Sequence, residues 1–225
     1  AVDKAEAEEA AAEVVNGDAP TAMAQACAEL GRPVVQISPA YVFDGAGETP
    51  FTPDHPTAPL GAYGRTKLKG EEGVRAAGGP HAILRTSWVF SAHGNNFLKT
   101  MLRLGAEREV IKVVDDQIGG PTPARAIAEG ALKLVSLLKD DPSKCGVYHL
   151  SGAPDVSWAE FARAIMVQAC LECEVIDIPT SAYPTPSKRP ANSRLDCSSL
   201  YVLGIARPDW RRAVASCLTE IGLRS

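Results

Sequence analysis

The chain has 225 residues with a formal net charge of −4, and 45% of the residues are hydrophobic while 22% are charged. This balance excludes an intrinsically disordered chain, and the short apolar runs predict no segment that crosses a bilayer. The charges form no block of one sign, so we expect neither nucleic acid nor a membrane surface as a partner.

The N-terminal segment predicts two helices. The Ala- and Glu-rich residues 3–15 form the first, and the second begins at Asp18 as N-cap and ends at Leu30, before Gly31. The opening residues, 1–6, have neither an initiator Met nor the features of a signal peptide. We therefore expect the sequence to start partway through a fold.

After Gly31, strand patterns alternate with helix patterns. Short β-branched runs predict strands, and caps and apolar periodicity predict helices. The predicted strands are 33–38, 81–86, 110–114, 147–150 and 174–178; the predicted helices are 61–77, 95–108, 123–139, one capped by Ser157, 196–203 and 208–221. This alternation predicts parallel βαβ units and an α/β sheet.

One long loop, residues 181–194, interrupts the pattern. A loop of this length in a compact chain is often functional. Its prolines favour an extended shape, and Lys188, Arg189 and Arg194 could meet an anion. A surface crossover with solvated charges explains the same composition equally well, so both interpretations stay open.

Six cysteines are scattered along the chain. We expect them to be reduced thiols of a cytoplasmic protein, because disulfide frameworks belong to small secreted domains. Cys170 and Cys173 have a metal-ligand spacing, yet no second pair follows. We therefore predict no metal site, and interpret the two as thiols near a helix end, one of them packed.

Tyr63 and Lys67 form the motif that carries chemistry. Their i, i+4 spacing near the start of a predicted helix places them on one face. A nearby ammonium lowers the pKa of a phenol, and such a pair suits proton donation to a carbonyl oxygen as a hydride arrives at carbon. The motif alone is weak, because a surface Tyr–Lys contact has the same spacing.

Its context resembles the dTDP-4-dehydrorhamnose reductases, a family of extended short-chain dehydrogenases/reductases. The matches run in order over essentially the whole chain. They are 1–6, Ser38-Pro-Ala-Tyr-Val-Phe43, 58–60, Tyr63-Gly-Arg-Thr-Lys-Leu68 with 70–71, Arg85-Thr-Ser-Trp-Val-Phe90, 94–97, 99–102, 116–122, 148–150, 183–186, 189–190, 192–193 and Pro208-Asp-Trp210.

The resemblance implies reduction of the C4 carbonyl of dTDP-4-dehydro-L-rhamnose by NADPH or NADH. Tyr63 would donate the proton, with Lys67 on the nicotinamide ribose and Ser38 as a further catalytic candidate. Ile37, Ser38, Tyr63, Lys67 and Thr86 would bind the cofactor. Candidates for binding the substrate are Pro39, Ala40, Trp88, Asn95, Asn96 and Arg189. A buried aromatic residue after a strand is the alternative interpretation of Trp88.

The implied fold is an incomplete Rossmann-like parallel sheet flanked by helices, plus a smaller C-terminal α/β substrate-binding region. We expect a partial dinucleotide-binding domain over 1–115 and a mainly substrate-binding region over 116–225, with some elements interleaved back. The expected partners are a dTDP-sugar and, as an assembly, a homodimer.

Two features depart from the family. Its Ser-Thr-Asp-Tyr reads Ser38-Pro39-Ala40-Tyr41 here, so a hydroxyl and a carboxylate are missing. The glycine-rich turn that lets a helix N-terminus approach a pyrophosphate does not occur in the sequence either. We expect ~60 residues, about two βα units, to precede residue 1 in the parent, and the chain alone to bind dinucleotide poorly.

These departures also fit a second hypothesis from another class. Proteins similar to this family serve as non-catalytic regulatory subunits, as in the beta subunit of methionine adenosyltransferase. The Tyr63–Lys67 pair separates the two hypotheses, because a purely structural subunit would not need it.

Overall fold

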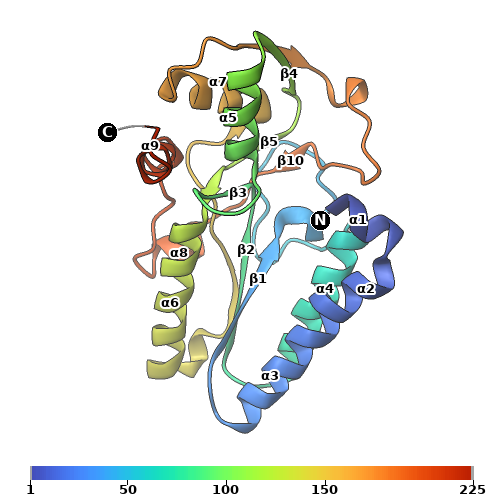
Figure 1. Cartoon of the computed structure of the whole chain (residues 1–225). Helices are drawn as coiled ribbons and strands as arrows, with labels where there is room; N and C mark the ends of the chain where they lie inside the picture. Colours follow the sequence, from blue (N-terminus) through green and yellow to red (C-terminus); the bar gives the residue numbers. More distant parts are fainter. Residues whose placement is uncertain (1, 224–225) are drawn as a thin grey trace.

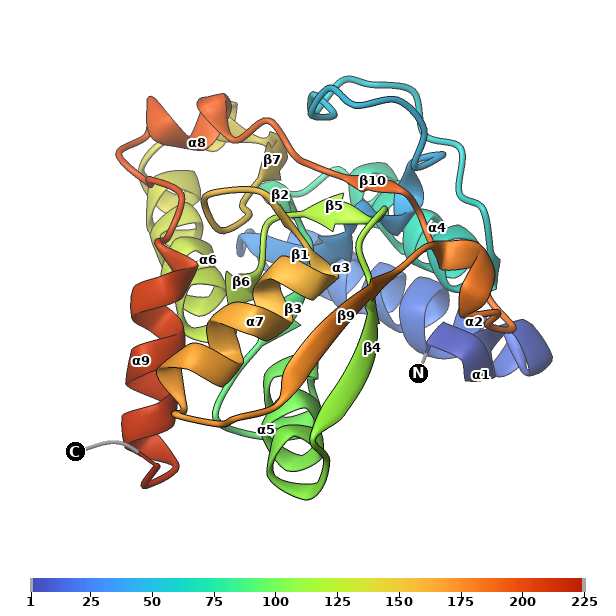
Figure 2. The ribbon, with the colours of Figure 1, turned by 90° about the horizontal axis from the view of Figure 1, so that it is seen from above.

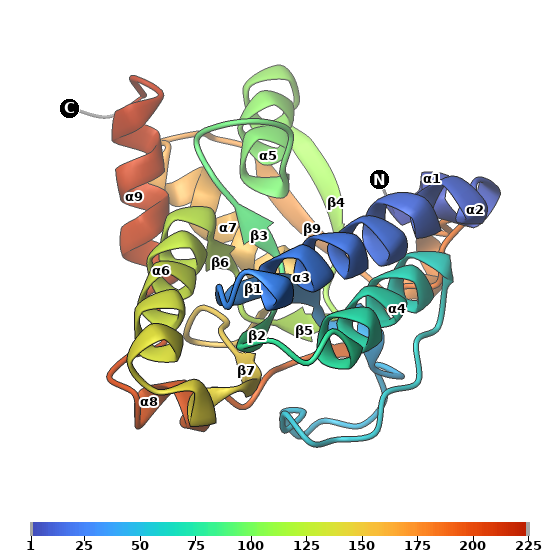
Figure 3. The same cartoon turned by 90° about the horizontal axis from the view of Figure 1, so that it is seen from below.

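The computed structural model describes residues 2–223. Ala1, which belongs to the first matched stretch and to the predicted first domain, lies outside these residues. Residues 224–225, at the end of the predicted second region, also lie outside them. The central sheet has the order β1-β2-β7, from Val34–Pro39, His81–Thr86 and Gly146–His149 (β1 and β2 are labelled in Figure 1, and all three strands in Figure 3). All its pairings are parallel, with Val34 opposite His81 and Pro39 opposite Thr86. The middle strand β2 is buried, which explains its apolar sequence, whereas β1, at an edge of this sheet, is mostly half-buried.

Helices cover both faces of this sheet. On one face lie α3 (Ala19–Glu29) and α4 (Ala62–Ala76), which run side by side in Figures 1 and 3. On the other lies α6 (Ala124–Asp140), which packs with β7 and α8 (Ser198–Tyr201) around Ala82 and Leu84. The predicted α/β fold with a Rossmann-like sheet is confirmed.

The N-terminal helices differ from the prediction at one point. The helices α1 (Val2–Ala7) and α2 (Glu9–Glu13) lead into a π-helical turn, η1 (Val14–Asp18), and then directly into α3. Asp18 has helical backbone angles and its side chain caps nothing, so its prediction as an N-cap was wrong. A π-helical turn absorbs an extra residue without ending a helix, and residue patterns do not reveal it.

A second core forms around a separate pair of strands. The parallel pair β4 (Val110–Val114) and β9 (Glu174–Ile178) lies against α5 (Phe97–Glu107) and α7 (Trp158–Gln168), with α9 (Trp210–Glu220) beyond α7 (Figure 2). Phe161 and Trp210 are fully buried there. The predicted cap Ser157 forms a capping box with Glu160.

The remaining elements are short. They are β3 (Val89–Phe90), β5 (Ile118–Gly119), β6 (Thr122–Pro123), β8 (Val156–Ser157), β10 (Asn192–Ser193) and the 3-10 turns η2 (Ala40–Val42), η3 (Pro142–Lys144) and η4 (Thr180–Ala182). Sequence patterns do not predict strands as short as these, because a period of two needs a longer run to be visible.

Both cores draw on both halves of the chain. Residues 97–114 pack in the second core with α7 and α9, whereas α6 and β7 return to the central sheet. The division near residue 115 into a dinucleotide part and a substrate part therefore stays a prediction. Within residues 2–223, no helix combines the length and the apolar character needed to cross a bilayer.

Candidate active site

A cavity of about 390 Å³ opens where β1 and β2 end. Carboxyl ends of parallel strands are where open α/β sheets bind ligands. The lining includes many of the residues singled out from sequence: Ile37, Ser38, Pro39, Ala40, Tyr63, Lys67, Thr86 and Trp88. The structure thus brings the Tyr-x-x-x-Lys pair, the end of β1 and the end of β2 to one place.

Tyr63 and Lys67 are half-buried on the first two turns of α4. The Lys67 ammonium donates to the Ile37 carbonyl at 2.7 Å, which fixes the lysine at the end of β1. Burial lowers the pKa of Lys67, and the Glu71 carboxylate opposes that shift.

The pKa of Tyr63 departs from the expectation. Burial, and then the neighbouring Tyr41, raise it above its ordinary value, whereas the sequence argument expected Lys67 to lower it. Desolvation disfavours the phenolate, and the rings of Tyr41 and Tyr63 meet edge to face at 5.6 Å. Tyr63 is therefore a protonated phenol at neutral pH, the state that a proton donor requires.

The end of β1 offers the cavity little polar chemistry. Pro39 and Ala40 line it without a hydroxyl, and Ser38 contributes one buried hydroxyl that has no hydrogen-bond partner among the described residues. On the neighbouring strand Thr86 lines the cavity, and its hydroxyl is buried and has no hydrogen-bond partner among the described residues. A buried polar atom without a partner is costly, so Thr86 is a ready contact for a ligand.

An aromatic wall closes one side of the cavity. Trp88 stacks on Trp158 with ring centroids 3.6 Å apart, and Phe97 lies 4.5 Å from Trp158. Trp88 has a left-handed backbone conformation with φ of 50°, which is strained for a tryptophan. A Cβ on Gly119 would lie 2.9 Å from the Trp88 ring, so only glycine allows this placement.

A second hollow of about 550 Å³ adjoins the first, sharing Tyr41, Phe97 and Trp158. Arg189 lines it from the long loop, and its guanidinium lies 2.6 Å from the Asp3 carboxylate and 3.5 Å from the Tyr41 hydroxyl. Arg189 therefore already has an acidic partner on α1.

Asn95 and Asn96 lie apart from the other residues predicted to bind the substrate. Asn96 caps α5, where its side chain accepts from the Lys99 amide and donates to the carbonyls of Ser91 and His93. Asn95 is exposed. Both are absent from the residues that line either hollow within the described chain.

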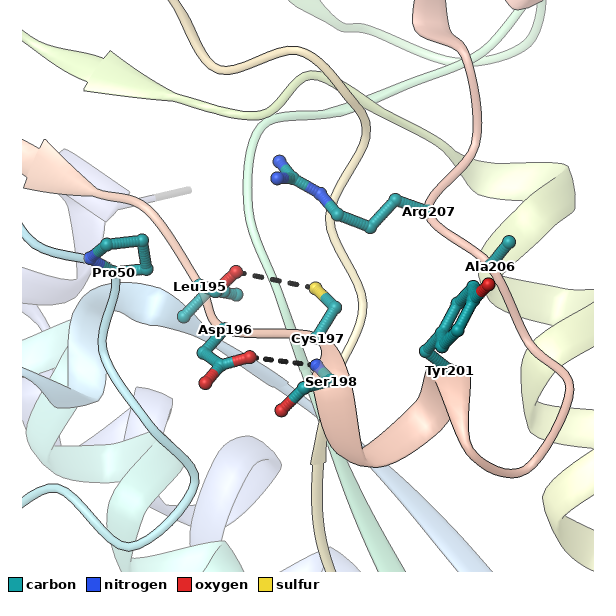
Figure 4. Close-up of a pocket in the computed structure, with 8 residues that line it drawn as sticks. All are labelled: Pro50, Leu195, Asp196, Cys197, Ser198, Tyr201, Ala206 and Arg207. Carbon is teal, nitrogen blue, oxygen red and sulfur yellow. Dashed lines mark hydrogen bonds between the residues drawn. The ribbon is translucent and has the colours of Figure 1, made fainter.

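A third hollow, of about 500 Å³, lies elsewhere, between the loop around Pro50 and α8 (Figure 4). Its charged side chains are already engaged: Arg207 pairs with Asp155 at 2.5 Å, and Asp196 accepts from the Ser198 amide. This hollow is therefore a weaker candidate for a ligand site than the cavity beside Tyr63.

The cysteines add no further site. Cys170 is exposed just after α7, and Cys173 is buried. Among residues 2–223, no group of three or more His, Cys, Asp or Glu side chains is placed to hold a metal ion.

Comparison with known proteins decides the family. The RmlD substrate binding domain family matches residues 1–223. The chain belongs to this family. A dTDP-4-dehydrorhamnose reductase of Burkholderia thailandensis is 44% identical, with 98% of this chain and 78% of that protein aligned. One of Escherichia coli strain K12 is 39% identical over 98% of this chain and 76% of its own length.

Solved structures of related proteins agree with this family membership. A dTDP-4-dehydrorhamnose reductase of Bacillus anthracis in complex with NADP superimposes with a TM-score of 0.91 at 35% identity, covering 97% of this chain and 76% of that one. One from Clostridium acetobutylicum gives a TM-score of 0.90 at 34% identity, covering 98% and 77%.

Sequence reasoning missed two residues of the site. Trp158 was used only as part of a helix pattern, and Tyr41 only as part of a matched stretch. Trp158 directly follows the N-cap Ser157 and so lies at the N-terminal end of α7. That position was the available signal. The edge-to-face contact of Tyr41 with Tyr63 had none, because it joins two segments that only the fold brings together.

Proposed function

We propose that this chain reduces the C4 carbonyl of dTDP-4-dehydro-L-rhamnose to dTDP-L-rhamnose with NADPH or NADH. The observation that carries the proposal is the cavity at the ends of β1 and β2, where a protonated Tyr63, Lys67 and the Trp88–Trp158 wall meet. Membership of the RmlD family and the reductases named among its relatives support this substrate.

Tyr63 is proposed as the proton donor. Its phenol gives its proton to the carbonyl oxygen as that oxygen gains charge, and its raised pKa keeps the proton in place until then. When bound, the nicotinamide cofactor supplies the hydride to C4. The other catalytic candidate, Ser38, lines the same cavity, and its buried hydroxyl, like that of Thr86, has no hydrogen-bond partner among the described residues.

The residues present fit the nicotinamide end of a cofactor. Lys67 uses one of its three ammonium protons on the Ile37 carbonyl, which leaves two for ribose hydroxyls. The Thr86 hydroxyl has no partner within residues 2–223, and Ile37 lines the same cavity. We propose Ile37, Ser38, Tyr63, Lys67 and Thr86 as the cofactor contacts.

The sugar nucleotide is proposed to lie against Pro39, Ala40 and Trp88, and to extend toward Arg189 in the adjoining hollow. Asn95 and Asn96 remain candidates at the start of α5. In this arrangement residues 1–115 mainly hold the dinucleotide and residues 116–225 mainly the sugar nucleotide. We also propose a cytoplasmic homodimer; the six free cysteines support a reducing compartment.

The test is turnover by the full-length protein. NADPH oxidation should depend on dTDP-4-dehydro-L-rhamnose, with dTDP-L-rhamnose as the product by mass spectrometry. The same assay with the Tyr63→Phe variant is the control for background oxidation. A folded protein that gives no product, but copurifies with a stoichiometric enzyme, would favour the regulatory-subunit hypothesis instead.

A further inference from the structure

One carboxylate oxygen joins three distant segments next to the catalytic tyrosine. Glu6 Oε1, on α1, accepts a hydrogen bond from the Ala62 amide at 3.0 Å and another from the Ser187 hydroxyl at 2.9 Å. Ala62 is the first residue of α4, and Tyr63 follows it directly. Ser187 belongs to the segment 183–189, here called the strap.

Helix α4 lacks a local cap. Its N-cap position is Gly61, which has no side chain, and the first turn contains no acidic residue. The first amides of a helix need acceptors, and a negative group there is favoured by the helix dipole. Glu6 supplies both the acceptor and the charge, although it lies on a different helix, far earlier in the chain.

The packing at Gly61 shows how close this contact is. A Cβ on Gly61 would lie 2.3 Å from Glu6 Oε1 and 3.1 Å from the Ser187 hydroxyl. The missing side chain therefore makes room for the carboxylate. If Glu6 were shortened, the same space would be free for a capping side chain at position 61.

The strap is held by the same face of α1. Asp3, one turn before Glu6, accepts from the Ser187 amide at 3.1 Å and from the Arg189 guanidinium at 2.6 Å. Ser187 is 1% exposed, and Arg189 lines the hollow beside the active site. Glu6 thus connects the wall of that hollow to the first turn of α4.

We propose that Glu6 is a positioning residue that caps the catalytic helix and couples it to the strap. This inference rests on the proposed reductase function. The bond to Ala62 sets the position of Tyr63 and so acts on kcat. The bond to Ser187 sets the strap and so acts on KM for the sugar nucleotide.

The first experiment separates the two bonds in the full-length protein. Glu6→Ala should lower kcat ~10-fold, because small misplacements of a reacting group are costly. It should also raise KM for the sugar nucleotide. Adding Gly61→Ser to Glu6→Ala restores a local cap, and should recover kcat within about threefold while KM stays raised. Glu9→Ala, which breaks the exposed pair between α2 and Arg65 of α4, is the matched control and should change neither.

Two milder variants cover the case in which Glu6→Ala does not fold. Glu6→Gln keeps an oxygen that can accept both bonds, and should retain kcat within about threefold. Ser187→Ala keeps the cap and loses the strap bond, so it should raise KM with kcat unchanged. A fall in kcat for Ser187→Ala as large as the rise in KM would overturn the division of roles.

A readout without turnover keeps the inference separate from the proposed function. Hydrogen exchange at the Ala62 amide should speed up in Glu6→Ala and slow again on adding Gly61→Ser. Unchanged exchange in Glu6→Ala, or recovered exchange without recovered kcat, would refute the positioning role. Absence of turnover in the wild-type protein would instead refute the reductase function. Hydrogen exchange at the Ala62 amide would then still test whether Glu6 caps α4.

Discussion

Pro39 on β1 and Thr86 on β2 are direct partners in the parallel register. Register partners in a sheet present their side chains on the same face. The strand position that lacks a hydroxyl therefore stands beside a buried Thr86 hydroxyl without a hydrogen-bond partner among the described residues, and both line the cavity.

This relationship predicts that Thr86 compensates for Pro39. Besides its proposed contact with the cofactor, the Thr86 hydroxyl is expected to stabilise the reacting oxygen. Thr86→Val, which keeps the shape but removes the hydroxyl, should therefore lower kcat roughly 10- to 100-fold. Adding Pro39→Thr to it should recover part of the loss. Steady-state kinetics at saturating cofactor measure both, with the exposed Thr219→Val as control. Equal kcat for wild type and Thr86→Val would contradict the prediction.

The Tyr63–Lys67 pair predicts a specific pH profile. Removing the proposed proton donor in Tyr63→Phe should lower kcat about 10²- to 10⁴-fold. Because burial raises the pKa of Tyr63 above its ordinary value, the phenol stays protonated through neutral pH, and its ionisation should cause no loss of rate there. A basic limb centred near pH 7 that disappears in Tyr63→Phe would show that the phenol ionises far more easily than its burial indicates.

The buried His149 predicts a loss of stability in mild acid. Burial, and then the charge of Arg85, lower its pKa from 6.5 to about 4. Between about pH 6.5 and pH 4, His149 is therefore protonated in the unfolded chain and neutral in the folded chain. Folding stability should fall by up to about 3 kcal/mol as the pH drops through that window.

Denaturant unfolding of wild type and His149→Phe at pH 7.5, 6 and 5 measures this contribution. The variant loses the contact with the Phe51 carbonyl, and should be less stable at pH 7.5. Its stability should also depend less on pH than that of the wild type. Parallel pH dependences for the two proteins would mean that another group is responsible.

The Trp88–Trp158 stack depends on Gly119. Gly119→Ala places a Cβ 2.9 Å from the Trp88 ring and 3.1 Å from the Ser193 side chain, so the ring has to move. We expect a changed near-UV circular dichroism signal and a severalfold higher KM for the sugar nucleotide. Gly146→Ala is the control, because its Cβ would approach nothing closer than 3.9 Å. An unchanged KM together with a displaced Trp88 would show that the Trp88–Trp158 stack is not part of the binding site.

Local signals made much of this fold predictable. Ser157 and Glu160 cap α7 from within its own first turn, and strands β2, β4 and β9 have the predicted bounds. The pairing of Tyr63 with Lys67 on one helix face was likewise a matter of spacing. Each of these depends on interactions between near neighbours in the chain.

Long-range contacts could not be predicted in this way. The acceptor for Lys67 is the Ile37 carbonyl at the end of β1, and the cap of α4 comes from Glu6 on α1. The prediction that Lys67 lowers the pKa of Tyr63 was wrong for the same reason. Its burial and its contact with Tyr41 exist only in the assembled fold, and they outweigh the local argument from Lys67.

The interleaving of the two cores has a consequence for how the chain folds. Strand β4 cannot pair with β9 until β9 has been synthesised, much later in the chain, and β2 cannot pair with β7 until β7 has been synthesised. Pairings so far apart in sequence give a high contact order, and such chains fold slowly. During synthesis, the ribosome will have released most of the chain before either core can close. Chaperone dependence and sensitivity to early proteolysis are therefore expected of this topology.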